Sequence, residues 1–440
     1  MRFHLLFILI VCSIPANAQK ADWLSKTDCG ALINMNKISA DPMGNVFAGG
    51  TYNGETVFRS DKNDTLITKY AYTKKAFVTR YNAAGKPTMV VQFRGCDYMR
   101  IGALKAMPGG ECLVVVDCNG AIEFVDPFGN HSKTGNNGRD NIYCITATGT
   151  IKWSTSVNVT NINFLEAGDD GTIYIHGTWN RYSANDGCLV TLFADGTPKD
   201  TIRFNGGAIN CMTLNGNDLI VGVVNPKYNP WSDAKAQKYF DLQPEHFGLF
   251  KINLTTMQSS KYYTIHLPMR GGYESNYASG FQCSINTSSG ATYADIMLPT
   301  ENGTTTFLNK KYARDGGTMH ILRLNTKGEI IADKGFSCQY YNYSMLPMEN
   351  GTLVLTMAVY GTAFHYENDS LALPGHTMFI DELVIMKLDQ QLNRIWWFTA
   401  GGTASNYHAT ILCRDATGRM YIASDLMESS QVFSPVFSKT

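Results

Sequence analysis

The sequence predicts an all-β protein, a seven-bladed β-propeller made of four-stranded antiparallel blades. A polar turn followed by an apolar strand recurs seven times, and a second hairpin pattern alternates with it. No long segment shows the apolar period of a helix. Charged residues make up only 17% of the chain, against 40 Gly, 23 Tyr and 22 Phe. That composition is typical of many short strands joined by turns.

The first repeated unit is a short apolar strand, a glycine turn and a second strand of β-branched and aromatic residues. Glycine adopts the positive φ of a tight hairpin turn, and Asp or Asn beside it tolerates that conformation. The seven copies are ISADPMGNVFAGG from Ile38, ALKAMPGGECLVVV from Ala103, FLEAGDDGTIYIHG from Phe164, CMTLNGNDLIVGVV from Cys211, CSINTSSGATYADIML from Cys283, MLPMENGTLVLTMAVYG from Met345 and ILCRDATGRMYIAS from Ile411.

The second repeated unit is an alternating strand, a polar turn and another strand, which predicts a second hairpin per blade. Six copies start at Ala76, Ile142, Cys188, Gly248, Met319 and Leu383. The turn glycines of the first unit are spaced about 60 residues apart, as expected for one four-stranded blade per repeat. A single blade cannot bury both of its faces, whereas stacking blades in a ring buries each face against a neighbour.

The last blade lacks its outer strand, because the chain contains seven first hairpins and only six full second ones. The segment ADWLSKTDCGALIN, which starts at Ala21, has the pattern of the missing strand. We expect residues 21–28 to pair beside the C-terminal segment and close the ring, because an unpaired blade edge exposes strand backbone. The alternative is a loose N-terminal segment and a last blade of three strands.

The first 18 residues have the pattern of a secretory signal peptide. A basic start, MRFH, precedes the apolar run LLFILIVCSI, and ANA ends at Ala18 as a cleavage site. We therefore expect residues 1–18 to be a signal peptide and residues 19–440 to form one β-propeller domain, exported to the periplasm or beyond the cell. No later segment holds 18 uninterrupted apolar residues, so no transmembrane segment is expected.

The ten cysteines after residue 18 occur singly, with no C-x-x-C pair. Export permits disulfides, and burial as small apolar side chains is the alternative for each thiol. The sequence does not determine which cysteines are paired.

The run DPMGNVFAGGT at 41–51 resembles the repeat of SBBP-type proteins, a bacterial seven-bladed β-propeller family. The second hairpin of that repeat is matched by AFVTRYNAAGKPTMV, IYCITATGTIKWSTS and LVIMKLDQQLNRIWW. The resemblance covers nearly all of residues 19–440, and it is strong in the first, third, sixth and seventh blades. It implies an exported propeller of mostly unassigned function. It brings no catalytic residues. The signal peptide, which ends in NAQ, looks like those of exported proteins of Bacteroidetes.

The sequence lacks the motifs that are typical of several classes of function. The formal net charge is zero and there is no basic stripe, so no nucleic-acid partner is expected. The Asp and Asn turns lack the dense oxygen spacing of a calcium loop, and no zinc motif, nucleophile elbow or P-loop is present. Adjacent cysteines of the quinoprotein type are also missing. We therefore expect neither a metal nor a cofactor.

Two groups of residues are candidates for ligand binding. Lys105, Glu166 and Arg414 are charged residues in first strands, which line the channel of a propeller; the alternative is that they are solvated or paired at strand ends. His176, Trp179 and Arg181 cluster in HGTWNRYSAND, which suits a sugar or a protein partner and equally suits an ordinary aromatic turn.

Long insertions separate the second and third strands of several blades. Residues 225–248 carry Tyr228 and Trp231, and residues 118–141 and 364–382 are also extended. Loops of this length are often functional. The alternative is that some of them only form an extra ribbon at a blade edge.

The sequence favours a non-enzymatic binding or scaffold protein over an enzyme. Its partner would be a protein or carbohydrate of the cell envelope or exterior, recognised through loops on one face. The alternative is an enzyme acting on extracellular polysaccharide in the central channel. A glycosidase needs two carboxylates about 5–10 Å apart. Only Glu166 is placed in a channel strand, with Glu123, Glu245 and Glu382 on loops.

Overall fold

The architecture was analysed in a computed structural model of the whole chain. The structure describes residues 20–29, 32–60, 65–68, 75–96, 98–134, 141–178, 187–205, 208–224, 239–241, 247–265, 283–285, 290–298, 304–307, 310–313, 318–367, 369–373, 382–400, 410–426 and 429–436. These residues form strands and turns without a helix. Within these ranges there is accordingly no helix of the length and hydropathy that crossing a bilayer requires.

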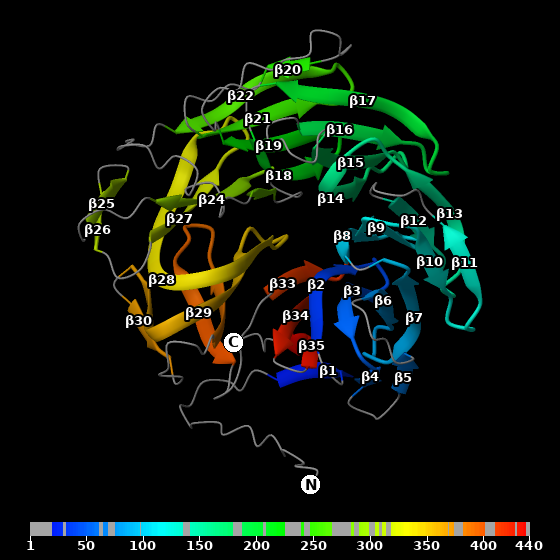
Figure 1. Cartoon of the computed structure of the whole chain (residues 1–440). Helices are drawn as coiled ribbons and strands as arrows, with labels where there is room; N and C mark the ends of the chain where they lie inside the picture. The colour runs from blue at the N-terminus through cyan, green and yellow to red at the C-terminus, as the bar shows by residue number, and fades with distance from the viewer. Residues whose placement is uncertain are drawn as a thin grey trace.

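The strands form antiparallel meanders, each named here by its first strand (Figure 1). The β2 meander contains β2 (Leu32–Ala40), β3 (Val46–Asn53), β6 (Lys75–Tyr81) and β7 (Pro87–Arg94). The β8 meander contains β8 (Met99–Ala106), β9 (Cys112–Cys118), β12 (Asn141–Ile145) and β13 (Ile151–Ser156). The β14 meander contains β14 (Thr160–Ala167), β15 (Ile173–Thr178), β16 (Gly187–Leu192) and β17 (Pro198–Asn205).

The same order of strands continues along the chain. The β18 meander contains β18 (Ala208–Asn215), β19 (Asp218–Val224), β21 (Phe247–Asn253) and β22 (Gln258–Ile265). The β23 meander contains β23 (Cys283–Ile285), β24 (Thr292–Leu298), β27 (Thr318–Leu324) and the start of β28 (Ile330–Pro347). The rest of β28 begins the next meander, with β29 (Leu353–Tyr366), β31 (Glu382–Leu388) and β32 (Arg394–Ala400). A separate hairpin joins β25 (Thr304–Phe307) and β26 (Lys310–Ala313).

The last meander combines the two ends of the chain. It contains β33 (Thr410–Arg414), β34 (Met420–Leu426) and β35 (Ser429–Val436), and β1 (Lys20–Cys29) pairs antiparallel with β35. The register runs from Lys20 opposite Val436 to Asp28 opposite Ser429. This is the pairing that the sequence predicts for residues 21–28.

The turns of the first hairpins follow the predicted chemistry. In the turn after β2, the Gly44 N–H donates to Asp41 O at 3.0 Å, and Gly44 has a φ of 82°. The Asp41 carboxylate accepts hydrogen bonds from the backbone N–H groups of Met43 and Asn45, each at 2.9 Å. The carboxylate therefore replaces water around the turn, which explains why Asp recurs beside the glycine.

Insertions between second and third strands extend the preceding meander. The pair β4 (Thr56–Ser60) and β5 (Thr65–Thr68) adds to β1. The pair β10 (Ile122–Val125) and β11 (His131–Thr134) adds to β7, and β20 (Tyr239–Asp241) adds to β17 in parallel. The end of β29 pairs with the start of β28 and with β30 (Asp369–Ala372). The alternative of an edge ribbon is thus confirmed for the described parts of 118–141 and 364–382.

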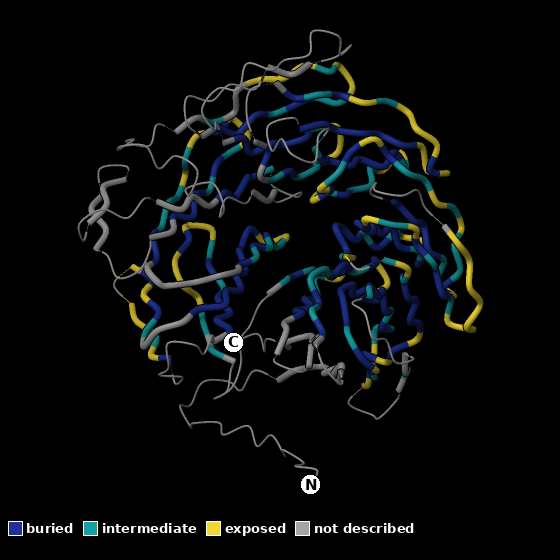
Figure 2. The backbone as a smooth tube through the Cα atoms, in the orientation of Figure 1, coloured by how far each residue is buried: buried dark blue, intermediate teal, exposed yellow. Residues whose placement is uncertain are grey.

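The hydrophobic core lies between the meanders. One cluster joins the β2 and β8 meanders through Phe47, Met89, Leu104 and Val114. Another joins the β2 and β33 meanders through Met35, Val46, Tyr421 and Ala423. Strand β9 is buried along its whole length, as expected for a strand covered on both faces. In Figure 2 the buried segments lie in the inner strands, and the outer strands carry most of the exposed residues.

The first strands face a common centre (Figure 1). Contacts join β2 to β8, β8 to β14, β14 to β18, β18 to β23, β23 to β28, β28 to β33 and β33 to β2. Antiparallel meanders with their first strands innermost and their apolar cores between neighbours are arranged as the blades of a β-propeller.

Candidate functional site

The candidate site is the inner wall, defined here as the described residues of the first strands β2, β8, β14, β28 and β33. Strand pairing puts these strands in a common register. Ala40 lies opposite Val46, Ala106 opposite Cys112, Ala167 opposite Ile173 and Arg414 opposite Met420. The preceding residues, Ser39, Lys105, Glu166 and Cys413, therefore occupy equivalent places in their meanders.

Lys105 and Glu166 form an ion pair between neighbouring meanders. Lys105 Nζ lies 2.5 Å from Glu166 Oε2, and their side chains are 32% and 31% exposed. A pair this accessible to water contributes about 0–1 kcal/mol to stability. The structure thus brings together two residues that the sequence analysis named as ligand-binding candidates. They form an ion pair with each other, which is the alternative that the sequence analysis gave.

Arg414 is also paired across two meanders. Its Nη1 lies 3.2 Å from Oε1 of Glu349, which follows β28. The Arg414 side chain is 19% exposed and that of Glu349 is 62% exposed. The three charged residues that the sequence analysis named in first strands, Lys105, Glu166 and Arg414, thus have oppositely charged partners.

Two further cations of the inner wall, Lys37 and Arg100, were missed in the sequence analysis. Arg100 Nε lies 2.7 Å from Asp117 Oδ2, and Arg100 Nη2 lies 3.4 Å from Asn161 Oδ1 in the next meander. Desolvation lowers the pKa of the half-buried Lys37, and the positive charge of Arg100 lowers it further. The signal that singled out Lys105 and Arg414, a charge within a first strand, applies equally to Lys37 and Arg100.

His176 lies on β15 and is buried, with 2% of its surface exposed. Its Nδ1 donates to Asn163 Oδ1 at 2.7 Å, and burial lowers its pKa to about 3. The imidazole is therefore neutral at physiological pH and presents little surface to a ligand. Trp179 and Arg181, predicted beside His176, and Tyr228 and Trp231, predicted on the insertion 225–248, lie outside the described residues. A ligand site at this cluster stays a prediction.

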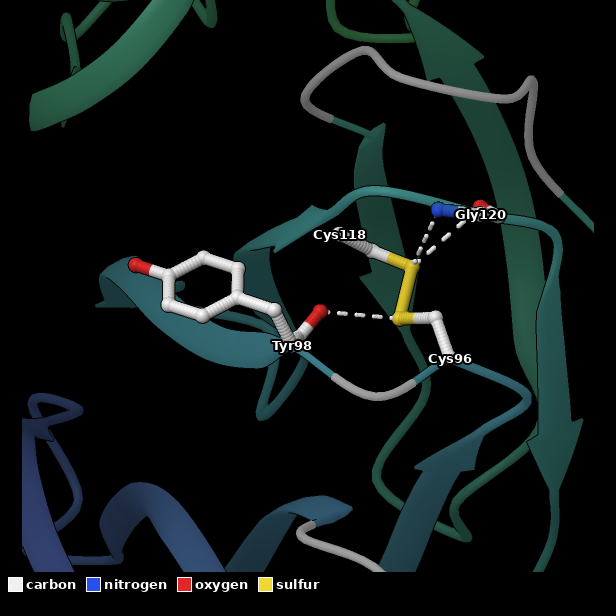
Figure 3. The surroundings of a disulfide bond; sticks show 4 residues. All are labelled: Cys96, Tyr98, Cys118 and Gly120. Atoms are coloured by element: carbon white, nitrogen blue, oxygen red, sulfur yellow. Dashed lines mark hydrogen bonds between the residues drawn. A yellow bond between two sulfur atoms is a disulfide. The ribbon is translucent and has the colours of Figure 1, made fainter.

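One disulfide joins Cys96, which follows β7, to Cys118 at the end of β9 (Figure 3). The Gly120 N–H donates to Cys118 Sγ at 3.3 Å. Cys112, Cys144 and Cys188 are free and buried, and burial raises the pKa of Cys144 to about 12. Both readings of the cysteines therefore occur, at different positions.

Carboxylates are dispersed in the described part of the chain. Glu123 lies on the outer ribbon β10, where its Oε1 is 3.0 Å from His131 Nδ1, so it does not approach the inner wall. Within the described ranges, no three His, Cys, Asp or Glu side chains gather as a set of metal ligands. Glu245 and the side chain of Glu382 lie outside the described residues.

No protein-family model matches this chain, and no curated protein matches it significantly. Among solved structures, Sqt1 from Chaetomium thermophilum is 11% identical, with a TM-score of 0.45 over 95% of this chain and 100% of its own. Virginiamycin B lyase from Staphylococcus aureus is 10% identical, with a TM-score of 0.46 over 94% and 99%. The C-terminal WD40 domain of Sif2 is 8% identical, with a TM-score of 0.44 over 93% and 98%. Likeness at this level carries no argument about function.

Proposed function

We propose that this chain is an exported, closed seven-bladed β-propeller that works as a binding or scaffold protein rather than as an enzyme. Its partner is a protein or a glycan of the cell envelope or exterior. Residues 19–440 form the single propeller domain, as in the SBBP-type family that the repeat resembles.

Closure of the ring is supported by equivalent contacts at two seams. Between the β23 and β28 meanders, Tyr293 Oη donates to Gly351 O at 2.8 Å. Between the β33 and β2 meanders, Tyr421 Oη lies 3.3 Å from Gly44 O, and it also lies 2.8 Å from Asp415 Oδ2 of its own meander. Both tyrosines stand three residues after a turn glycine, and both reach the turn glycine of another meander. The seam between the chain ends is thus built like a seam between consecutive repeats.

The observation that carries the binding function is the composition of the inner wall. Lys105 and Arg100 on β8 and Arg414 on β33 each form an ion pair with a carboxylate, and these first strands face a common centre (Figure 1). Glu166, the acid that the sequence analysis places in the channel, is held by Lys105, and Glu123 lies at an outer edge. This arrangement suits polar recognition on a rigid frame better than a pair of carboxylates poised around a scissile bond.

Export is supported by two independent features. Residues 1–18 have the pattern of a signal peptide, and Cys96 and Cys118 form a disulfide of the kind that persists in oxidising compartments. Expression of the full chain in a Gram-negative host should yield an exported protein that begins at Gln19. A protein that keeps Met1 and stays in the cytosol would contradict export.

The binding function is tested by retention of envelope components on the immobilised protein. A matched variant that lacks residues 226–245, and melts at the same temperature, reports whether the insertion takes part. We expect a protein or glycan to be retained and to bind the purified chain saturably in solution. Glycan that shortens on incubation would favour the polysaccharide-acting enzyme instead. No retained component would contradict the proposal.

A further inference from the structure

Lys37 occupies a position of its first strand at which three other meanders have an uncharged residue. Pairing puts Lys37 opposite Gly49, Ala103 opposite Val115, Phe164 opposite His176 and Ile411 opposite Ala423. These four residues are equivalent, because each lies three positions before the last paired residue of its first strand. Ala103 is buried, and Phe164 and Ile411 pack against apolar clusters. A lysine here brings a charge to a seam that is otherwise closed by apolar contacts.

Within the described part of the chain, Lys37 also differs from the neighbouring cations because its side chain has no partner. Lys105, Arg100 and Arg414 each have a carboxylate within ion-pair distance. Among the described residues, the Lys37 side chain makes no ion pair or hydrogen bond, and the charge that acts on it is the positive charge of Arg100. An uncompensated, desolvated cation destabilises a fold, so its presence at a seam indicates a role other than stability.

The residue before Lys37 adds an unused acceptor. Asn36 is the extra residue of a β-bulge between Met35 and Lys37, and bulges commonly redirect side chains. Its Nδ2 donates to Ile101 O at 3.3 Å, which ties β2 to β8. Its buried Oδ1 has no hydrogen-bond partner among the described residues. Two consecutive residues thus leave a cationic donor and a neutral acceptor unsatisfied.

We propose that Lys37, Asn36 and Arg100 form an anion-binding subsite on the inner wall that takes the carboxylate of an acidic sugar. The carboxylate accepts from the Lys37 ammonium within the positive field of Arg100, and Asn36, tied to Ile101 O, holds the bulge next to Lys37 in place. Arg100 stays oriented by Asp117 and Asn161. This inference rests on the proposed function, because it names the class of glycan that the propeller binds.

The test is calorimetric titration of the purified full-length protein with oligomers of glucuronate, galacturonate and mannuronate. Neutral oligosaccharides of equal length and inorganic phosphate are the comparison ligands. We expect one uronate oligomer to bind, with affinity lowered at least tenfold in Lys37→Met and unchanged in Lys152→Met. Lys152 lies on the outer strand β13 and pairs with Glu111 at 2.8 Å, so its loss is a matched control for charge.

Melting of the ligand-free variants gives a second readout. Removal of an unpaired, desolvated cation should raise the melting temperature in Lys37→Met, whereas a structural lysine would lower it. A lowered melting temperature with unchanged uronate affinity would overturn the subsite. Equal binding of neutral sugars, or binding of phosphate without uronate, would overturn the acidic-sugar ligand. If no uronate binds while an envelope component is still retained, the subsite fails and the binding function stands.

Discussion

Two levels of the inner wall use the same residue type for different purposes. At the turn-side level, Lys105 pairs with Glu166, and Arg414 pairs with Glu349, each across two meanders. At the bulge level, Lys37 meets the positive field of Arg100 and no described carboxylate. The paired cations hold neighbouring sheets together. The unpaired cation weakens its seam, and we attribute it to a ligand because a structural charge would have a partner.

Removal of β1 should have the largest effect, because the last meander then loses a whole strand. Deletion of residues 19–30 removes β1 and exposes the edge of β35. We expect the melting temperature to fall by on the order of 10 °C or more and uronate binding to be lost. Deletion of residues 1–18 alone is the control. An unchanged melting temperature after the longer deletion would show that β1 does not close the ring.

A second desolvated base, His176, extends the comparison because its side chain is neutral. Its pKa is lowered from 6.5 to about 3, so only the unfolded chain takes up a proton between these values. The folded state should therefore lose stability, on the order of a few kcal/mol, as pH falls from 6.5 towards 3.

The measurement is urea unfolding of the wild type and of His176→Gln across this pH range. Glutamine keeps a donor for Asn163 Oδ1 and does not titrate, so its curve should fall less steeply with acid. Parallel curves for the two proteins would contradict the assignment of the acid effect to His176.

The continuity of the wall from β33 to β2 is tested by two matched tyrosines. Tyr421→Phe and Tyr293→Phe each remove one hydroxyl at a seam, and Tyr421→Phe also removes the hydrogen bond to Asp415 Oδ2 within its own meander. Each loss should cost about 1 kcal/mol of unfolding free energy. If Tyr293→Phe destabilises the protein and Tyr421→Phe does not, the seam between the chain ends is not built as proposed.

The smallest effect is expected from converting the paired level into an unpaired one. Glu166→Gln removes the carboxylate that pairs with Lys105. Lys105 would then resemble Lys37, which has no carboxylate partner among the described residues. Because both side chains are about one-third exposed, the loss of stability should stay below about 1 kcal/mol. The free energy of unfolding at low and high salt measures it. A loss of several kcal/mol would mean that the ion pairs of the turn-side level contribute more to the free energy of unfolding than their exposure to water implies.

Particular residues show where prediction from sequence succeeded. The Asp41–Gly44 turn, the all-β class and the pairing of residues 21–28 with the C-terminal strand followed from local pattern and strand count. Lys105 and Glu166 were placed in first strands for the same reason. Their pairing with each other was left open, because it depends on how two sheets stack.

Other features have no local signal. The insertion after β9 returns to β7 of the preceding meander, and Cys96 pairs with Cys118 rather than with Cys112. Both depend on distances between segments that are separated in the sequence. Lys37 shows the same limit, because its lack of a partner is a property of its surroundings and not of its identity.

The sequence by itself determined the repeat, the turns, the strand alternation and the missing outer strand of the last sheet. These follow from backbone conformation and from the burial of alternate side chains, which act over a few residues. Only the tertiary structure decided which charges are paired, which histidine is neutral and which insertions cover a neighbouring edge. Those properties arise from desolvation and Coulomb interaction between sheets, and they depend on distances that stacking alone sets.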